Sequence, residues 1–219
     1  MSEISTAEAK KVSLVTRSPI KEYTLFFIGQ SGAGKETQVK KYTHLVEETL
    51  ETKVLSISTG DEFRAWIQRG TILAQSIKNE NSSGKLQRAV YATHLILSRL
   101  DAEYTGSEHI VLDGSPRSVS EADGLMEIFR KLSLKSVLIF IKVADDVARK
   151  RLKIRHATHP RQDTASHQAI SEKLNFFHKE VLPAIEYMKN QKDVLVIEIN
   201  GNQGPDEVFE EIKKALSRL

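Results

Sequence analysis

The sequence has no cysteine among its 219 residues. That excludes a disulfide framework and a cysteine-ligated zinc site, and it is compatible with a reducing compartment. No apolar run approaches the length of about 18 residues that a membrane-spanning helix needs. The N-terminus also lacks the apolar stretch of a signal peptide. We therefore expect a cytoplasmic protein without a transmembrane span.

A strong charge of one sign is missing as well. The formal net charge is +3, which by itself is too small to indicate binding to nucleic acid or to a membrane. Apolar residues make up 40% and charged residues 28% of the chain, as in ordinary globular domains. We expect residues 1–20 to form a polar tail and residues 21–219 to form one domain.

After the tail, short apolar runs alternate with helical patterns. The expected strands are Tyr23–Ile28, Val54–Ser58, His109–Leu112, Ser136–Val143 and Val194–Ile199. The expected helices cover roughly residues 35–50, 61–80, 85–103, 119–132, 145–156, 165–190 and 205–218. Alternation of this kind predicts an α/β fold, in which a parallel sheet is covered by helices on both faces.

The first strand runs into a glycine-rich stretch, Gly29-Gln30-Ser31-Gly32-Ala33-Gly34-Lys35-Glu36-Thr37. It fits the G-x-x-x-x-G-K pattern of phosphate-binding loops, although Thr37 stands one place later than usual. The glycines let backbone N–H groups turn around a phosphate, and the following helix adds the positive end of its dipole. We expect Lys35 to reach the outer phosphates and the Thr37 hydroxyl to bind Mg²⁺. The simpler alternative is a turn that merely needs glycines.

Two further motifs follow strands, at the edge where open α/β sheets place their active sites. The segment from Ser58 to Arg64 ends in an arginine that can bind a phosphate through a bidentate contact. The alternative is a capped helix with a solvated arginine. The segment Asp113-Gly114-Ser115-Pro116-Arg117 offers a carboxylate for the water shell of Mg²⁺ and a second phosphate clamp. Here the alternative is a Gly-Pro turn with a capping aspartate.

A basic series follows the fourth strand. It consists of Arg151, Arg155, Arg161 and Lys173, with Asp163 among them. Arg151 and Arg155 are four residues apart and share a helix face. Arg161 falls in a polar loop, where a cation can close over a transferring phosphate and exclude water. A solvated basic helix is the alternative.

Together these motifs resemble the nucleoside monophosphate kinases, and among them the adenylate kinases most closely, over about residues 23–217. The Gly29–Thr37 loop is similar to the family's phosphate-binding loop, including its offset threonine. The segment from Asp113 to Arg117 is similar to the family's Asp-Gly-Phe-Pro-Arg, with Ser115 in place of phenylalanine. Asn200-Gly201 resembles the loop whose backbone reads the adenine of ATP. The short gap from Arg155 to Arg161 resembles members without a zinc-binding insertion in the lid.

The resemblance implies a three-layer P-loop sandwich with a five-stranded parallel sheet, an acceptor-binding region at about 59–88 and a short lid at about 156–166. It implies a monomer that transfers the terminal phosphoryl group of ATP to AMP, giving two ADP. ATP and Mg²⁺ would be its cofactors and small nucleotides its partners, with neither nucleic acid nor membrane involved.

The resemblance also assigns roles to residues. The catalytic set is Lys35, Asp113, Arg117, Arg155 and Arg161. The ATP-binding set is Gly29, Gly32, Ala33, Gly34, Lys35, Glu36, Thr37, Arg151 and Gly201. The acceptor-binding set is Thr59, Gly60, Arg64, Gln87, Gly114, Arg117, Glu121, Arg161 and Lys173. Thr37 and Asp113 would hold Mg²⁺, largely through water.

The chain departs from the family pattern at several of these positions. Glu121 stands where the family has a glutamine that reads the acceptor adenine, and a carboxylate would suit guanine better. Together with Gln87, it motivates a first alternative, a kinase for GMP, CMP or UMP. Lys173 replaces an arginine and Glu36 a common glycine. They motivate a second alternative, a nucleotide-binding relative with low turnover.

Overall fold

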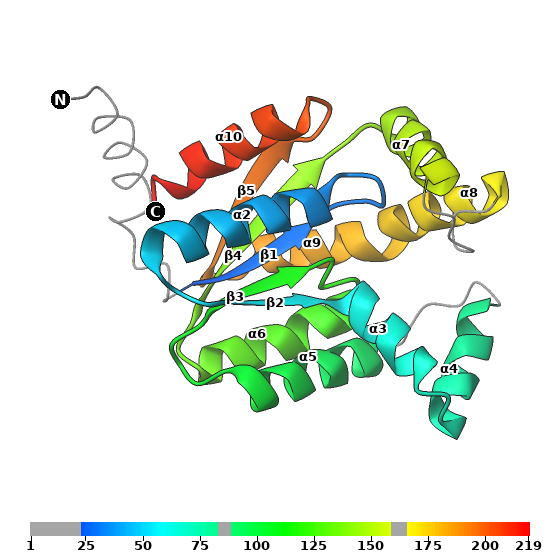
Figure 1. Cartoon of the computed structure of the whole chain (residues 1–219), viewed down its shortest axis with the longest axis horizontal. Coiled ribbons are helices and arrows are strands. Elements are labelled where there is room, and N and C mark those ends of the chain that lie inside the picture. Colours follow the sequence, from blue (N-terminus) through cyan, green and yellow to red (C-terminus); the bar gives the residue numbers. More distant parts are fainter. Residues whose placement is uncertain (1–22, 83–88, 159–165) are drawn as a thin grey trace.

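The computed structural model describes residues 23–82, 89–158 and 166–219 of the chain, with side chains described outside 78–82 (Figure 1). Its strands are β1 (Tyr23–Ile28), β2 (Val54–Ser58), β3 (His109–Asp113), β4 (Lys135–Lys142) and β5 (Val194–Asn200). They form one five-stranded sheet in the order β2-β3-β1-β4-β5, and every neighbouring pair is parallel. The expected α/β fold with a five-stranded parallel sheet is confirmed.

Helices cover both faces of this sheet (Figure 1). In chain order they are α2 (Lys35–Leu50), α3 (Thr59–Gln68), α4 (Ile72–Ser82), α5 (Ala89–Glu103), α6 (Val119–Lys131), α7 (Asp145–Thr158), α8 (His167–Phe176), the π-helical turn η3 (Phe177–Val181), α9 (Leu182–Lys189) and α10 (Pro205–Leu216). α2 and α10 pack on one face, and α5, α6, η3 and α9 pack on the other. Since both faces are covered, the inner strands β1, β3 and β4 are largely buried and mostly apolar along their length.

The central strand β1 shows how the two halves of the core divide. Phe26 and Ile28 join the cluster on the α5–α6 side, whereas Leu25 and Phe27 join the cluster on the α2–α10 side. All four side chains are at most 2% exposed. Successive side chains of a strand point to opposite faces, so one apolar run supplies both layers of the core.

Two expected helices are divided in the structure. The pattern at 61–80 breaks between α3 and α4, where Gly70 adopts a φ of +67° that ends a helix readily. The pattern at 165–190 becomes α8, η3 and α9, which follow one another without a gap.

Parts of three expected regions lie outside the described residues. These are the tail at residues 1–20, most of the lid at 156–166 and the end of the acceptor-binding region at 59–88. The division into these regions stays a prediction.

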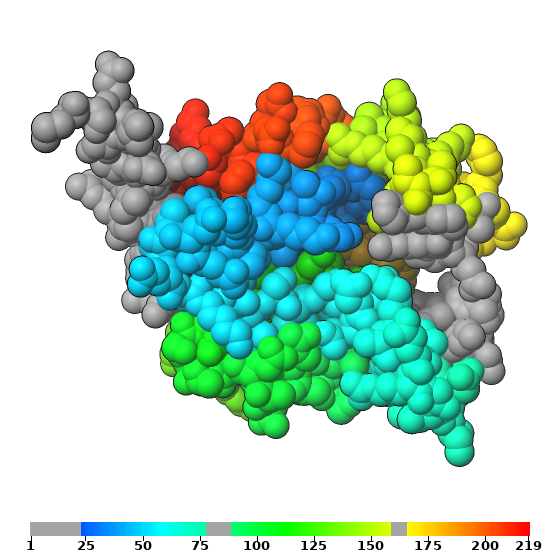
Figure 2. Space-filling model, in the orientation of Figure 1, coloured from blue at the N-terminus to red at the C-terminus, as the bar shows by residue number. Residues whose placement is uncertain are grey.

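The parallel order brings the carboxyl ends of the strands to one edge of the sheet. Asp113 at the end of β3 lies in register with Phe27 on β1 and with Ser58 on β2. The segments that follow β1, β2 and β3 therefore start side by side, although they lie far apart in the sequence. Figure 2 shows the surface recessed between α2 and α3, next to this edge. None of the helices in the described ranges is both long and apolar enough to cross a bilayer.

Candidate functional site

The glycine-rich loop between β1 and α2 is shaped by close packing. Gly29 has a φ of +154°, and a Cβ there would lie 2.5 Å from the carbonyl oxygen of Ile141 on β4. Gly32 has a φ of +89°, and its Cβ would lie 2.8 Å from the carbonyl oxygen of Ala148 on α7. A side chain fits at neither position, so these glycines hold the loop against β4 and α7.

The loop leads into α2, whose N-terminus has no side-chain cap. Gly34 is the N-cap residue and has a φ of +89°, a conformation that favours glycine, although a Cβ on it would meet no atom within 4 Å. The positive end of the helix dipole lies at this loop. The Lys35 ammonium lies over the loop and donates to the carbonyl oxygens of Gly29 and Gln30 at 2.8 and 3.1 Å. Ala33 is buried, and Thr37 is exposed on the first turn of α2.

Glu36 does not lean toward the loop. Its carboxylate accepts a hydrogen bond from Lys40, one turn further along α2, at 2.8 Å. This pair is exposed to solvent. Its negative charge nevertheless contributes to the raised pKa of Asp113 at the end of β3, so Glu36 lies within electrostatic reach of the site. Its role in ATP binding stays a prediction.

Three cations from different segments lie close together beside two glycines. A Cβ on Gly114 would lie 3.7 Å from Cε of Lys35 and 3.4 Å from Nη2 of Arg117. A Cβ on Gly60 would lie 3.7 Å from the same Nη2 and 3.4 Å from Nη1 of Arg64. Lys35, Arg117 and Arg64 thus form a cation row from the phosphate loop to the start of α3. A row of this kind can hold the phosphates of two ligands that meet end to end.

The middle of the row is fixed by hydrogen bonds. Arg117 donates through Nε to the carbonyl oxygen of Gly114 at 2.7 Å and through Nη2 to the hydroxyl of Thr59 at 3.1 Å. Thr59 is fully buried, and its hydroxyl lies 3.3 Å from the carbonyl oxygen of Gly114. The end of β3 and the start of α3 are therefore tied together through Arg117.

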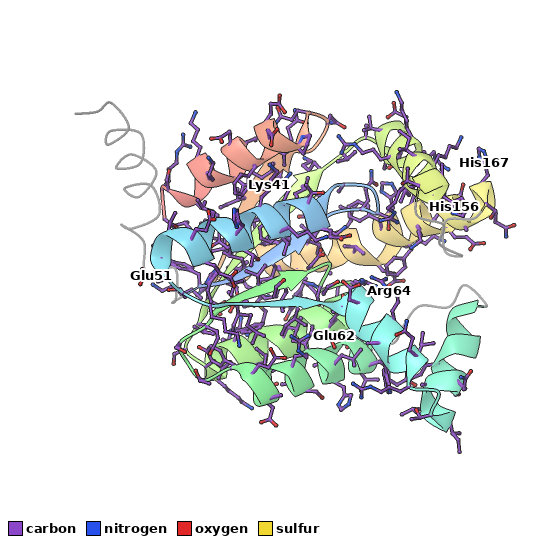
Figure 3. The ribbon with its side chains drawn as sticks, in the orientation of Figure 1. Lys41, Glu51, Glu62, Arg64, His156 and His167 are labelled. Atoms are coloured by element: carbon purple, nitrogen blue, oxygen red, sulfur yellow. The ribbon has the colours of Figure 1, made fainter. Side chains whose placement is uncertain are left out.

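Arg64 forms the outer end of the row. Its guanidinium pairs with Asp61, one turn earlier in α3, and its side chain is about half exposed. Figure 3 shows Arg64 on α3 and His156 at the end of α7.

The pKa of Lys35 reflects its burial and the charged groups around it. Burial is the main cause that lowers the pKa of Lys35, to about 8. The positive charges of Arg117, Arg155 and Lys173 lower it further, whereas the Asp113 carboxylate raises it. Arg155 on α7 and Lys173 on α8 are therefore close enough to Lys35 for their charges to lower its pKa. Their roles at the phosphates stay predictions. Burial also raises the pKa of Asp113, and Lys35 and Arg117 oppose that shift.

Arg151 and Gly201 both relate to the turn that follows β5. Arg151 on α7 donates to the carbonyl oxygen of Gln203 at 3.1 Å, in the turn between β5 and α10. Gly201 opens that turn, and its N–H donates to the carbonyl oxygen of Lys142 at 2.7 Å. A Cβ on Gly201 would lie only 2.5 Å from Cγ2 of Val143, so the glycine is required by packing alone.

Glu121 points into the protein. It lies in the first turn of α6, is 2% exposed, and accepts hydrogen bonds from Ser115 and from the backbone of Arg117. Arg161 and Gln87, which the sequence assigns to the phosphates and to the acceptor, lie outside the described residues. Their roles stay predictions.

One contributor to the site is not visible in the sequence. Arg99 on α5 pairs with Glu62 on α3 and with Glu103 on its own helix. The pair with Glu62 joins the helix that carries Thr59 and Arg64 to the body of the protein. Glu62 and Arg99 are far apart in the chain, so no local spacing could have indicated it.

A parallel sheet with a glycine-rich loop between its central strand and a helix, and with cations converging on that loop, defines a P-loop nucleotide-binding protein. The sequence model of the adenylate kinase family matches residues 27–193. The chain therefore belongs to the adenylate kinase family. It is an enzyme, a phosphotransferase of nucleotides.

Individual relatives agree over nearly the whole chain. An adenylate kinase of Prochlorococcus marinus is 33% identical over 199 residues, which cover 88% of this chain and 97% of the relative. Adenylate kinases of Mycolicibacterium vanbaalenii and Cyanothece sp. are 33% and 28% identical, and each alignment covers 89% of this chain. The alignments cover 99% of the Mycolicibacterium vanbaalenii protein and 95% of the Cyanothece sp. protein.

Proposed function

We propose that this protein transfers the terminal phosphoryl group of ATP reversibly to AMP, giving two ADP. The observation that carries the proposal is the cation row of Lys35, Arg117 and Arg64, which runs from the phosphate loop to the start of α3. It matches two nucleotides whose phosphates meet between the two segments. The name adenylate kinase, shared by the relatives described above, supports ATP and AMP as the two nucleotides.

Transfer between two phosphates needs positioning and charge stabilisation more than a covalent step. In our proposal, Lys35 binds the outer phosphates of ATP together with the backbone of residues 29–34. Arg117 and Arg64 hold the phosphate of AMP, next to Gly60 and Gly114. The acceptor is already an anion, so no general base is required.

The remaining cations complete the charge around the transferring group. Arg155 and Lys173 act on Lys35 electrostatically, which supports placing them around the phosphates. We propose that they stabilise the charge that develops between donor and acceptor. We propose the same role for Arg161, and we propose that Gln87 contacts the acceptor base. Arg151 and Gly201 would border the nucleoside of ATP.

The residues near Lys35 also fit Mg²⁺. Asp113 offers a carboxylate at the tip of β3, and Thr37 offers an exposed hydroxyl on the first turn of α2. Hard oxygen ligands and retained waters are what Mg²⁺ prefers. We propose that Thr37 and Asp113 hold the ion largely through water. When bound, it neutralises charge on the outer phosphate oxygens of ATP.

We propose further that the protein is a cytoplasmic monomer, with the acceptor-binding region at about 59–88 and the lid at about 156–166. The absence of cysteine is compatible with a reducing compartment. The start of α3 beside Arg117 supports the acceptor region.

The first test is an ADP-release assay with ATP·Mg²⁺ and each of AMP, GMP, CMP and UMP. We expect turnover with AMP far above that with the other three acceptors. Lys35→Ala should reduce kcat/KM by about 100-fold or more, because the outer phosphates lose their main cation. The matched control is His44→Ala further along the same helix, which breaks only an exposed pair with Glu48 and should stay close to the wild-type rate. Absence of turnover with AMP despite ATP binding would overturn the proposal.

A further inference from the structure

Glu121 is a buried carboxylate with both of its oxygens engaged by the protein. One oxygen accepts from the hydroxyl of Ser115, and the other accepts from the backbone N–H of Arg117 at 3.0 Å. Glu121 is 2% exposed and Ser115 is fully buried. The carboxylate therefore faces the loop between β3 and α6 rather than solvent.

The same loop is tied to α6 a second time. The hydroxyl of Ser118 caps the helix by accepting from the N–H of Glu121 at 3.2 Å. The side chain and the backbone of Glu121 thus both bind the segment from Ser115 to Ser118. This segment carries Arg117, whose guanidinium in turn bonds to Gly114 and Thr59. Arg117 is the middle cation of the row, and its position depends on the backbone segment that Glu121 binds.

A contact between Glu121 and a nucleotide base would break this arrangement. To reach a ligand, the carboxylate would have to leave the Ser115 hydroxyl and the Arg117 N–H without their acceptor. Buried donors without an acceptor are costly, and Ser115 has no access to solvent that could replace the bond.

We propose that Glu121 is a positioning residue, which together with Ser115 fixes the loop carrying Arg117, and that its carboxylate does not read the acceptor base. The inference rests on the proposed role of Arg117 as a clamp for the acceptor phosphate. It replaces the role that the sequence assigns to Glu121 as a ligand of the acceptor base. In this arrangement a carboxylate at position 121 gives the protein no preference for guanine.

The chemistry of glutamine makes the two roles separable. A glutamine at position 121 can accept from the Arg117 N–H through its oxygen and donate to the Ser115 hydroxyl through its amide, because a hydroxyl both donates and accepts. Glu121→Gln therefore keeps both contacts with the loop. If Glu121 instead bound the acceptor base, Glu121→Gln would change the hydrogen-bonding pattern that the side chain presents to the base.

The experiment compares Glu121→Leu with Glu121→Gln. The measurements are kcat and KM for AMP, the dissociation constants for AMP and GMP by calorimetry, and the melting temperature. We expect Glu121→Leu to lower kcat/KM for AMP by about 10- to 100-fold, because two buried donors lose their acceptor. Glu121→Gln should restore most of that loss. The ratio of the AMP and GMP dissociation constants should stay within about threefold in both variants.

Two further variants separate positioning from stability alone. In an Arg117→Ala background, Glu121→Leu should cost much less in kcat/KM than it does alone, because the cation that it positions is gone. A purely structural role would add its full cost in either background. The matched control is Asp123→Asn on the same helix, which weakens a bond from Tyr187 away from the loop and should leave kcat/KM near wild type.

A change of about tenfold or more in the AMP-to-GMP ratio in Glu121→Gln would overturn the inference, since it would make Glu121 a reader of the base. Full additivity with Arg117→Ala would overturn it as well. If Glu121→Leu does not fold, Ser115→Ala removes one of the two bonds and should lower kcat/KM for AMP several-fold without changing the ratio. The wild-type rate with AMP tests the proposed function by itself, so the two failures are distinguishable.

Discussion

At the scale of single residues, two glycines lie next to the cations of the site. A Cβ on Gly60 or Gly114 would be in ordinary van der Waals contact with the guanidinium of Arg117. The sequence predicts that both glycines belong to the site, because they follow β2 and β3. It cannot predict that a cation lies beside each of them, since this depends on the register of β2 and β3 in the sheet.

Gly201→Ala should be strongly destabilising. Its Cβ would lie 2.5 Å from Cγ2 of Val143 and 2.9 Å from the carbonyl oxygen of Lys142. Overpacking of this kind costs about 1–3 kcal/mol. Thermal unfolding measures it, and ATP affinity should fall in parallel because the turn that holds Arg151 shifts. The control is Gly124→Ala on α6, where a Cβ would meet only Thr93 at 3.9 Å and should be neutral or stabilising. Equal melting temperatures for the two variants would contradict the packing argument.

The lowered pKa of Lys35, about 8, predicts how the rate depends on pH. Above that pH the free enzyme loses the ammonium charge, so kcat/KM for ATP should fall by up to about tenfold per unit. kcat should persist to higher pH, because bound phosphates favour the charged form and raise the pKa in the complex. Lys35→Arg should remove the alkaline fall of kcat/KM, since a guanidinium stays charged. A fall that persists in this variant would assign the titration to another group.

The linkage between this pKa and folding has a definite sign. The native pKa lies below the ordinary value of 10.5, so the unfolded chain holds more protons between pH 8 and 10.5. Lys35 therefore reduces the stability of the native state below pH 8, and this cost disappears as the pH rises through that window. Bound phosphates offset the same cost by pairing with the ammonium.

At the scale of elements, α3 is held to the body of the protein by an ion pair that lies outside the site. Glu62 on α3 is about one-sixth exposed and pairs with Arg99 on α5. A partly buried pair of this kind contributes more than a surface pair, because removing one partner leaves the other poorly solvated. The orientation of α3 decides where Thr59 and Arg64 lie.

Arg99→Met should therefore affect acceptor binding without touching the site. We expect a loss of about 1–3 kcal/mol in the free energy of unfolding and a several-fold higher KM for AMP, with kcat nearly unchanged. Chemical denaturation and initial-rate kinetics measure the two effects. Lys131→Met breaks an exposed pair on α6 and should change neither quantity by much. An unchanged KM for AMP in Arg99→Met would show that α3 is positioned by its apolar contacts alone.

Elements also show what the sequence could and could not predict. The strands were predictable to within about a residue, because apolar runs between helical patterns have few alternatives in a parallel sheet. The break between α3 and α4 had a local signal that the helical periodicity hid, namely Gly70 followed by Thr71, whose hydroxyl accepts from the N–H of Ala74. The π-helical turn Phe177–Val181 lies between two helices without a gap and had no such signal. The inward direction of Glu121 was also beyond reach. It depends on a hydroxyl six residues away that becomes buried only when α6 packs on the sheet.

At the scale of the whole molecule, the order β2-β3-β1-β4-β5 puts the first strand in the middle of the sheet. The chain must therefore return to β1 twice, once with β3 and once with β4, to pair both edges of this strand. The same topology gathers residues from most of the sequence at one edge. This edge is where the proposed sites of both nucleotides lie.

The central place of β1 has a consequence for synthesis on the ribosome. β1 is made first, yet neither of its hydrogen-bonded neighbours exists until His109–Asp113 and then Lys135–Lys142 have been translated. Pairings between distant segments form slowly, and a growing chain emerges at about 5–20 residues per second. Nascent chains that end before β4 therefore carry an apolar strand with bare edges, which makes them substrates for chaperones. Nucleotide affinity should arise late in translation, when the loop after β1 is first held from both sides.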